Sequence, residues 1–400
     1  MTRVFVNLSR QASLDAFNLR LNRRDFFLLL VAFLLTRALI VGVGVWSMDN
    51  QPMTEGEEYT HLLDGGAALD MWYRWDAGFY ATIATYGYDW MNENRPADDM
   101  AFFPLYPVLV HLVSGLTPTG CALSPYLSTC ATLGGLLVSN LALFAALIVL
   151  FDFVRGHFGK PAAWRAALLL LASPISIFLS GVYTESLFLL LTLLTFWLIE
   201  RRWFAVAILT AALACLTRSV GVALYPALLW IAWQSPREQR VLRLILAQIP
   251  LLVFLGYIFG AGISVGDPFA YFQTYESIWG RTAGNPIEAF TVYISGVDVA
   301  LLGWHPAWLD LILTLIFLVL AALAWRKNRA WGLFALFALL IPIASGTLSA
   351  MPRYGAVIFP LTIVLALYAD KLWRAFVIYG ASIGLALVTI SRFVTWRWIA

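Results

Sequence analysis

The stretch FFLLLVAFLLTRALIVGVGVW, residues 26–46, decides the fold class of this chain. It is an apolar run interrupted by one charge, Arg37, and it is long enough for a helix to cross the hydrocarbon core of a bilayer. Comparable runs recur along the 400 residues, which are 61% hydrophobic and only 12% charged, with a mean hydropathy of +0.79. A typical soluble domain carries about 25% charged residues. The sequence therefore predicts an all-α polytopic membrane protein, and the continuous runs lack the alternation of a membrane β-barrel.

The residues before this run predict its direction. Residues 1–25 carry five arginines against only Asp15 and Asp25, and the positive-inside rule places such a segment in the cytoplasm. The run is too long for a removable signal peptide, and no small-residue cleavage site follows it. We therefore expect a cytoplasmic N-terminus and a first span that leads outward.

The residues after the run form the longest polar segment. Residues 47–100 hold eleven of the 23 acidic residues and only two basic ones, so we expect an outer first loop over 47–130. Within it, the spacing from Asp76 to Tyr86 predicts a surface helix, with Gly87 just after its end. The run 101–117 is short and two prolines interrupt its start, so we interpret it as re-entrant or interfacial.

The remaining apolar runs alternate with basic clusters and give about eleven spans in one membrane domain, 1–400. The run 203–233 is interrupted at Arg218 and is either one long tilted span or two short ones. A second outer segment is expected over 264–306. The other expected spans are 131–153, 163–181, 185–199, 241–263, 307–325, 331–350, 354–369 and 374–392.

The cysteines and the net charge exclude some function classes. The three cysteines show no metal-ligand spacing, so no metal site is predicted, although a divalent metal is not excluded. Cys121 and Cys130 fall in the expected outer loop, where they are either free or a disulfide. The net charge of +3 gives no reason to expect nucleic acid as a partner.

Several stretches with unusual polar residues are predicted on one side of the membrane. Since residues that share a function must share a side, we interpret these stretches as parts of one outer site. They are residues 72–88, 181–186, 218, 267–272 and 351–354.

Asp76 has two interpretations. As the residue before a helix, it could accept the first free backbone N–H groups as an N-cap. As a carboxylate among aromatic residues at the outer mouth of a membrane bundle, it could act as a general base toward an acceptor hydroxyl.

The arginines at span boundaries also have two interpretations. A guanidinium in or beside the hydrocarbon region is costly unless paired, so Arg353 and Arg218 are candidates for binding a phosphate. The alternative is snorkelling to the lipid headgroups. Structural alternatives likewise exist for Asp267 as a turn residue, Glu185 as a helix-start residue, and Arg74 as a partner of Asp76 or Asp70.

Several segments in order resemble the PIG-V-like mannosyltransferases, which are related to the second mannosyltransferase of glycosylphosphatidylinositol assembly. The resemblance runs from about residue 26 to 370, and each motif alone is short. The segments are Arg74-Trp75-Asp76-Ala77-Gly78-Phe79-Tyr80, Phe102-Phe103-Pro104-Leu105-Tyr106-Pro107, Ser139-Asn140, Pro174-Ile175-Ser176-Ile177-Phe178, Tyr183-Thr184-Glu185-Ser186-Leu187-Phe188, Thr217-Arg218-Ser219-Val220-Gly221, Gly266-Asp267-Pro268 and Pro352-Arg353-Tyr354.

The resemblance implies a GT-C-type bundle that inverts the anomeric carbon of a sugar carried on polyprenyl or dolichyl phosphate. It implies that Asp76 is the catalytic base, and we expect Arg353 and Arg218 to hold the donor phosphate. Ser219 stands where Asn or Thr is expected, so the donor pocket departs from the family pattern. Further substrate contacts are expected from Arg74, Trp75, Tyr80, Tyr183, Glu185, Asp267 and Tyr354.

The predicted function is therefore a glycosyltransferase, a mannosyltransferase by resemblance, in a bacterial plasma membrane with its site on the outer face. The expected partners are the lipid-phosphate donor, a glycolipid or glycan acceptor and membrane lipids, with protein partners open. The alternatives are a transferase for another lipid-phosphate sugar, such as arabinose or glucose, and a lipid flippase or transporter. A flippase would carry ionisable residues deep in its spans.

Overall fold

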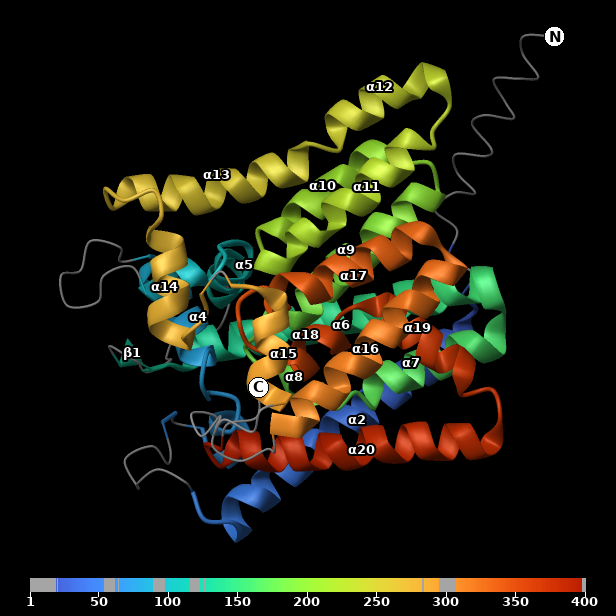
Figure 1. Cartoon of the computed structure of the whole chain (residues 1–400). Helices are drawn as coiled ribbons and strands as arrows, with labels where there is room; N and C mark the ends of the chain where they lie inside the picture. Colours follow the sequence, from blue (N-terminus) through green and yellow to red (C-terminus); the bar gives the residue numbers. More distant parts are fainter. Residues whose placement is uncertain are drawn as a thin grey trace.

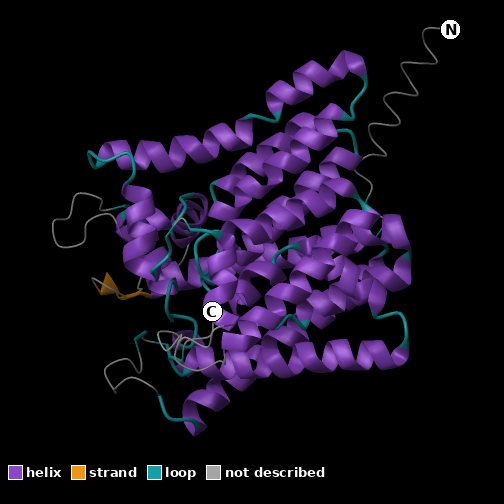
Figure 2. Ribbon diagram, viewed as in Figure 1, coloured by secondary structure: helices purple, strands orange, loops and turns teal. Residues whose placement is uncertain are grey.

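The computed structural model describes residues 19, 21–53, 62–63, 65–88, 98–115, 123–124, 127–282, 284–294 and 307–397. This part of the chain is a bundle of helices with one small pair of strands at its edge (Figures 1 and 2). The all-α fold class is confirmed, because the strands β1 (Leu123–Ser124) and β2 (Leu127–Ser128) are only two residues each.

Five described segments are long and apolar enough to cross a membrane, by length and composition. They confirm a multi-pass membrane protein, whereas the count of about eleven spans stays a prediction. The long segments are α2 (Arg23–Asn50), α6 (Thr129–Phe158), α12 with α13 (Arg237–Leu246 and Ile249–Ser264), α16 (Ala307–Lys327) and α20 (Leu372–Val394).

A second group of helices is apolar but shorter, and it fills the space between the long ones. Its members are α7 (Lys160–Leu171), α9 (Glu185–Glu200), α10 (Phe204–Cys215), α11 (Leu224–Trp233), α17 (Arg329–Ile343) and α19 (Phe359–Tyr368). The predicted spans 163–181, 331–350 and 354–369 are therefore wrong in length. Proline explains much of this, because it disfavours the helical conformation of the residue before it. Thus α7 ends before Pro174, and α19 begins at Phe359-Pro360 after a break.

The run 203–233 forms two short helices, which decides between the two alternatives left by the sequence. The helices α10 and α11 are separated by Arg218 in extended conformation and by the 3-10 turn η3 (Ser219–Ala223). The predicted span 241–263 is also interrupted, between α12 and α13, where Pro250 lies in the first turn of α13.

Short helices gather at one end of the bundle and in its breaks. The helix predicted from Asp76 to Tyr86 is confirmed as α4 (Ala77–Tyr86), followed by Gly87 at a φ of 80°, whereas its location at the membrane surface stays a prediction. The other short elements are α3 (Ala67–Asp70), η2 (Asp98–Ala101), α5 (Leu105–Ser114), α8 (Ser176–Ser180), α14 (Ala270–Trp279), α15 (Pro286–Ile294) and α18 (Met351–Ala356). Figure 1 shows α4, α5 and α14 together at the left edge, beside β1.

The core lies where α6, α7, α9, α16, α17 and α19 pack together. Large side chains that are almost completely buried fill it, among them Phe153, Phe188, Trp331, Phe334 and Phe359. Their burial removes a large apolar area from the surroundings and fixes the ends of these helices relative to one another.

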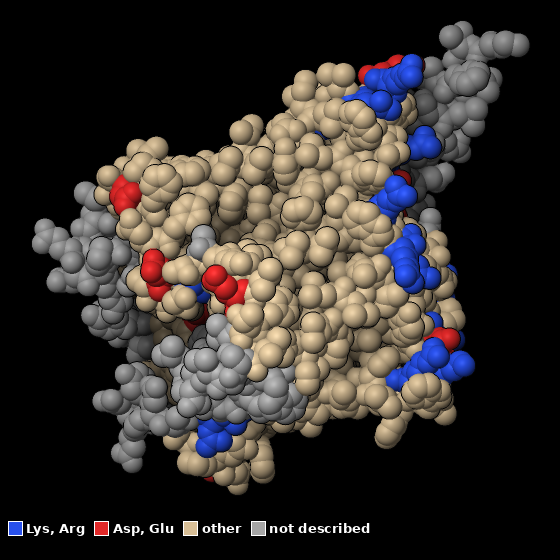
Figure 3. Space-filling model, in the orientation of Figure 1, with Lys and Arg blue, Asp and Glu red and all other residues tan. Residues whose placement is uncertain are grey.

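Basic side chains gather along the opposite edge. In Figure 3 most visible Lys and Arg side chains lie on the right, over α12 and the helix ends beneath it, whereas the left edge carries α4, α5 and α14. This separation is the pattern that the positive-inside rule describes for two faces of a membrane protein.

Some predictions fall on residues outside the described ranges. These are the basic segment 1–18 and Cys121; of the other two cysteines, Cys130 is disulfide-bonded and Cys215 is free and buried. The outer segments 47–130 and 264–306 keep the status of predictions.

Candidate active site

A cavity of about 650 Å³ opens where the short helices meet the bundle. That volume suits a small ligand or one sugar unit with its phosphate. Segments far apart in the sequence line it with charged and aromatic side chains. They include Trp75, Asp76, Tyr80, Arg218, Tyr275, Trp279, Arg281, Tyr293, Arg353 and Tyr354.

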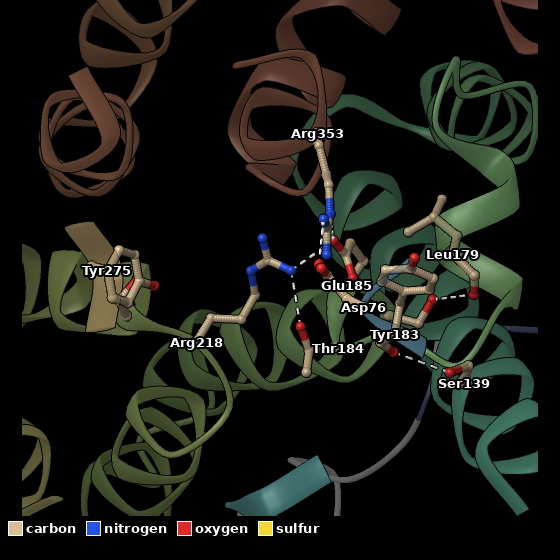
Figure 4. A network of polar contacts seen from close by, with 11 residues as sticks. Asp76, Ser139, Leu179, Tyr183, Thr184, Glu185, Arg218, Tyr275 and Arg353 are labelled. Carbon is tan, nitrogen blue, oxygen red and sulfur yellow. Dashed lines mark hydrogen bonds and ion pairs between the residues drawn. The ribbon is translucent and has the colours of Figure 1, made fainter. Parts of the chain in front are cut away.

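Asp76 lies on the wall of this cavity, just before α4. Its backbone is already helical, with a φ of −57°, and its side chain makes no capping hydrogen bond. The N-cap interpretation is therefore wrong. Instead, Oδ2 accepts a hydrogen bond of 3.0 Å from Nη1 of Arg353 (Figure 4). Oδ1 has no partner among the described residues, so one carboxylate oxygen is free to accept a proton.

The residue before Asp76 adopts an uncommon backbone conformation. Trp75 has a φ of 56°, which bulky residues rarely adopt, and strain of this kind occurs mostly at functional sites. Two contacts hold it in place. Its ring lies 5.3 Å from that of Trp396, and the hydroxyl of Tyr183 donates a 2.7 Å hydrogen bond to the carbonyl of Arg74. The direction of Asp76 is therefore set by tertiary contacts.

Arg74 does not line the cavity, in contrast to its predicted role in substrate binding. It is completely buried and forms a 2.7 Å ion pair with Asp70. Its Nε also donates to the carbonyl of Val394, at 3.2 Å. Arg74 therefore ties the loop before α4 to the end of α20, which agrees with the structural alternative noted for it.

Glu185 joins the two predicted phosphate-binding arginines. It lies in the first turn of α9, fully buried, and its Oε1 accepts from Nη1 of Arg218 at 2.6 Å and from Nε of Arg353 (Figure 4). The N-terminus of a helix favours a negative charge at this position. The helix-start interpretation is thus correct for its place in the helix, but its side chain holds the arginines. Oε2 is buried and without a partner among the described residues.

Arg218 reaches Glu185 because the chain breaks between α10 and η3. Its φ of −152° is extended, and its Nη1 also donates to Oγ1 of Thr184 at 2.9 Å. The turn that follows packs tightly on α10, since a Cβ on Gly221 would lie 2.5 Å from the carbonyl oxygen of Ala214. A glycine is therefore required for this close approach.

Arg353 lies in α18, a segment distant in sequence from Asp76 and Arg218, and lines the same cavity. Its guanidinium lies 4.8 Å from the ring centre of Tyr183 and 4.9 Å from that of Phe178, which matches cation–π geometry. Burial alone would lower the pKa of Arg353, but the carboxylates of Glu185 and Asp76 raise it well above its ordinary value. Arg353 is therefore charged, and its Nη2 has no partner among the described residues.

Of the three predicted tyrosines, two line the cavity and one is buried next to it. Tyr80 and Tyr354 line the cavity, whereas Tyr183 is completely buried beneath Arg353. Burial raises the pKa of Tyr80, so its phenol stays protonated at neutral pH and is a donor rather than a base.

Asp267 lies outside the cavity, contrary to its predicted substrate contact. Its carboxylate accepts from the backbone N–H of Phe269 at 2.8 Å and from Nε2 of Gln273 at 2.7 Å. These bonds fix the turn between α13 and α14, so the turn interpretation holds for this residue.

Arg281 is a cavity residue that the sequence analysis missed. It follows α14, its exposed fraction is 7%, and it donates to Oγ of Ser345 at 2.8 Å and to the carbonyl of Ser349 at 2.6 Å. One signal was available, because Arg281 is the only Lys or Arg between Arg243 and Arg326. Within the described ranges, no three His, Cys, Asp or Glu side chains are grouped as a metal ion would require.

Comparison with known proteins gives one family and several weaker similarities. The model of the family described as "Mannosyltransferase (PIG-V)" matches residues 27–290, which include Asp76, Glu185, Arg218 and Arg281. The "GPI mannosyltransferase 2" of two strains of Cryptococcus neoformans var. neoformans is 31% identical over 150 residues. That match spans 37% of this chain and 34% of the fungal protein.

Two kinds of solved structure are also similar. ArnT from Cupriavidus metallidurans bound to undecaprenyl phosphate matches with a TM-score of 0.46 and 14% identity, covering 91% of this chain and 76% of that one. The Archaeoglobus fulgidus oligosaccharyltransferase tethered with an acceptor peptide gives a TM-score of 0.48 and 13% identity, covering 92% and 56%.

Proposed function

Because the chain belongs to the PIG-V mannosyltransferase family, we propose that it transfers mannose from a polyprenyl- or dolichyl-phosphate donor to a glycolipid or glycan acceptor. The proposal extends to an inverting mechanism on a GT-C-type bundle and to a site on the outer face of the membrane. The observation that carries it is the contact of Asp76 with Arg353 on the wall of one cavity.

The proposed reaction assigns opposite tasks to these two residues. The acceptor hydroxyl oxygen bonds to the anomeric carbon while the bond from that carbon to the phosphate oxygen breaks. Asp76 takes the hydroxyl proton through its free Oδ1, as a general base does. The leaving lipid phosphate keeps the electron pair, and its growing negative charge is stabilised by guanidinium N–H groups.

The hydrogen bonds left unused by Arg353 and Arg218 support this assignment. In Arg353, Nε contacts Glu185 and Nη1 contacts Asp76. In Arg218, Nη1 contacts both Glu185 and Thr184. The Nη2 groups of both arginines have no partner among the described residues. Two such groups suit the oxygens of one phosphate, which accepts charge-assisted hydrogen bonds from arginine.

The arrangement of the whole bundle supports the membrane side in this proposal. Several cavity residues come from the short helices α4 and α14, which Figure 1 places at the edge opposite the one where most visible Lys and Arg side chains gather (Figure 3). If the basic edge faces the cytoplasm, as positive-inside statistics favour, the cavity faces outward.

The test is sugar transfer by the purified full-length chain in detergent with a mixed lipid extract as acceptor. Polyprenyl-phosphate mannose is compared with the glucose and arabinose donors, and Asp76→Asn with wild type. We expect transfer from the mannose donor and a loss of about 10² to 10⁴-fold in Asp76→Asn, the usual contribution of a general base.

The matched control is Asp267→Asn, because Asp267 is a carboxylate outside the cavity. We expect it to keep transfer close to wild type. Unchanged transfer by Asp76→Asn would remove the base from the proposal, and preference for another donor would replace mannose with that sugar.

A further inference from the structure

The charges of the cavity are not balanced, and the excess belongs to one residue. Two carboxylates, Asp76 and Glu185, pair with two guanidiniums, Arg218 and Arg353. This group is therefore close to neutral before any ligand arrives. Arg281 lines the same cavity as a third guanidinium.

Arg281 has hydrogen-bond partners but no neutralising one. Its two Nη groups donate to the neutral oxygens of Ser345 and Ser349, and Nε has no partner among the described residues. No described carboxylate lies within ion-pair distance of it; Asp310 acts on it only electrostatically, from the start of α16. A buried charge without a counter-ion is costly, so a ligand anion would stabilise this position.

The position of Arg281 places it beside the other cavity arginines. Both Arg281 and Arg218 have their guanidinium carbon 5.5 Å from the ring centre of Tyr354. Tyr354 follows Arg353 directly in α18. Arg218 and Arg281 therefore share the ring of Tyr354, and Arg353 is joined to Arg218 through Oε1 of Glu185. All three guanidiniums line one cavity, within reach of a single phosphorylated ligand.

We propose that Arg281 binds the phosphate of the lipid-phosphate donor and supplies the uncompensated positive charge of the site. This rests on the proposed function, in which the phosphate is the leaving group. The donor is a phosphodiester with one negative charge, and the product is a monoester whose second charge develops during transfer. Proton transfer to Asp76 leaves the group around Glu185 with one excess positive charge, which matches the charge that develops. The charge that the donor already carries when it binds is not matched by this group, and Arg281 can neutralise it.

The competing explanation is that Arg281 only fastens the segment after α14 to the loop at Ser345 and Ser349. Ala350 follows this loop at a φ of 62° and precedes α18, so a loosened loop would also displace Arg353. The variants must therefore separate the effect of the Arg281 charge from the effect of its hydrogen bonds to Ser345 and Ser349. Arg281→Gln removes the charge, Arg281→Lys keeps it, and Ser345→Ala weakens the fastening and keeps the charge.

The experiment measures binding of polyprenyl monophosphate and of the uncharged polyprenol to the purified full-length protein. We expect wild type to prefer the phosphate. We expect Arg281→Gln to bind it about tenfold or more weakly, the usual effect of losing one charge-assisted contact, with polyprenol binding unchanged. Arg281→Lys and Ser345→Ala should stay within about threefold of wild type.

Three results would overturn the proposal. Wild-type phosphate binding by Arg281→Gln would show that the charge is not used. Equal losses for phosphate and polyprenol, or a loss in Ser345→Ala as large as in Arg281→Gln, would assign Arg281 to fastening alone. If wild type itself shows no preference for the phosphate, the lipid-phosphate donor of the proposed function is contradicted as well. A failure seen only in the Arg281 variants contradicts the role of Arg281 and leaves the proposed donor in place.

Discussion

Glu185 shows how one buried carboxylate can organise a whole site. It is fully buried, and a single oxygen, Oε1, contacts Arg218 and Arg353 from two different segments. Removing one partner of a buried ion pair leaves an uncompensated charge and typically costs about 3 to 5 kcal/mol. Here the loss would affect two arginines together.

We predict that Glu185→Gln lowers both stability and transfer. Thermal unfolding in detergent measures the first effect, and transfer per folded molecule measures the second, with a decrease of tenfold or more expected. The matched control is Asp152→Asn, which breaks another buried pair, with Arg201 at 2.6 Å, away from the cavity. It should lose stability but keep its transfer per folded molecule. Equal transfer per folded molecule in both variants would contradict the role of Glu185.

At the residue scale, the sequence predicted the charged group because charges among apolar residues are conspicuous. Asp76, Arg218 and Arg353 stand out for this reason, and the structure brings them to one cavity. Arg74 was equally conspicuous, but its partner is Asp70, four residues earlier. Which cation pairs with which carboxylate depends on packing, so the sequence did not distinguish a structural arginine from a cavity arginine.

Arg281 was missed for a related reason. Its surroundings in the sequence, Trp279-Gly280 before it and Thr282 after it, are ordinary for an interfacial segment. Only the contacts with Ser345 and Ser349, more than sixty residues later, place it on the cavity wall.

At the element scale, the breaks between helices place the functional side chains. Glu185 begins α9, Arg218 separates α10 from η3, and Arg353 lies in α18 just before another break. A side chain at a helix end can turn into a cavity without leaving the backbone of a span unsatisfied. Proline and glycine at these breaks were visible in the sequence. The lengths of α7 and α17 were not, because apolar residues continue past their ends.

We predict that Gly221→Ala displaces Arg218. The new methyl group would lie 2.5 Å from the carbonyl oxygen of Ala214, so η3 must move away from α10. Overpacking of this kind typically costs about 1 to 3 kcal/mol. The rate of sugar transfer from the donor should fall severalfold or more, and the unfolding temperature of the variant should be lower than that of wild type.

Gly256→Ala in α13 is the matched control, since a Cβ there would meet nothing within 4 Å. It should leave transfer unchanged and leave stability equal or slightly higher, because alanine favours helix. An unchanged unfolding temperature and rate in Gly221→Ala would show that η3 can shift without disturbing the site.

At the scale of the whole molecule, the two edges of the bundle differ in charge and in architecture. Most visible basic side chains lie along one edge, and the short helices α4, α5 and α14 lie at the other (Figures 1 and 3). The family of membrane transferases and the all-helical bundle were both predictable from hydropathy and from the order of the motifs. The number of spans stays a prediction, because several apolar helices are shorter than a bilayer is thick.

We predict that the two edges face opposite sides of the membrane. Ser277 in α14 and Lys371 before α20 are both exposed, and single cysteines at these positions can be labelled with a membrane-impermeant maleimide. We expect Ser277→Cys to react in intact cells and Lys371→Cys only after permeabilisation. The unmodified chain, which carries three cysteines, measures the background that is subtracted from both variants. Labelling of both positions in intact cells would contradict the predicted topology.

The long sequence separation of the ion pairs has a consequence for how the chain is made. Asp76 pairs with a residue 277 positions later, and Glu185 with one 168 positions later. During synthesis both carboxylates enter the membrane well before Arg353 leaves the ribosome. Until then Glu185 has only Arg218, and Asp76 has no cation from this network. A nascent chain halted before α18 would thus hold an unneutralised acid at Asp76, which distinguishes it chemically from a finished chain.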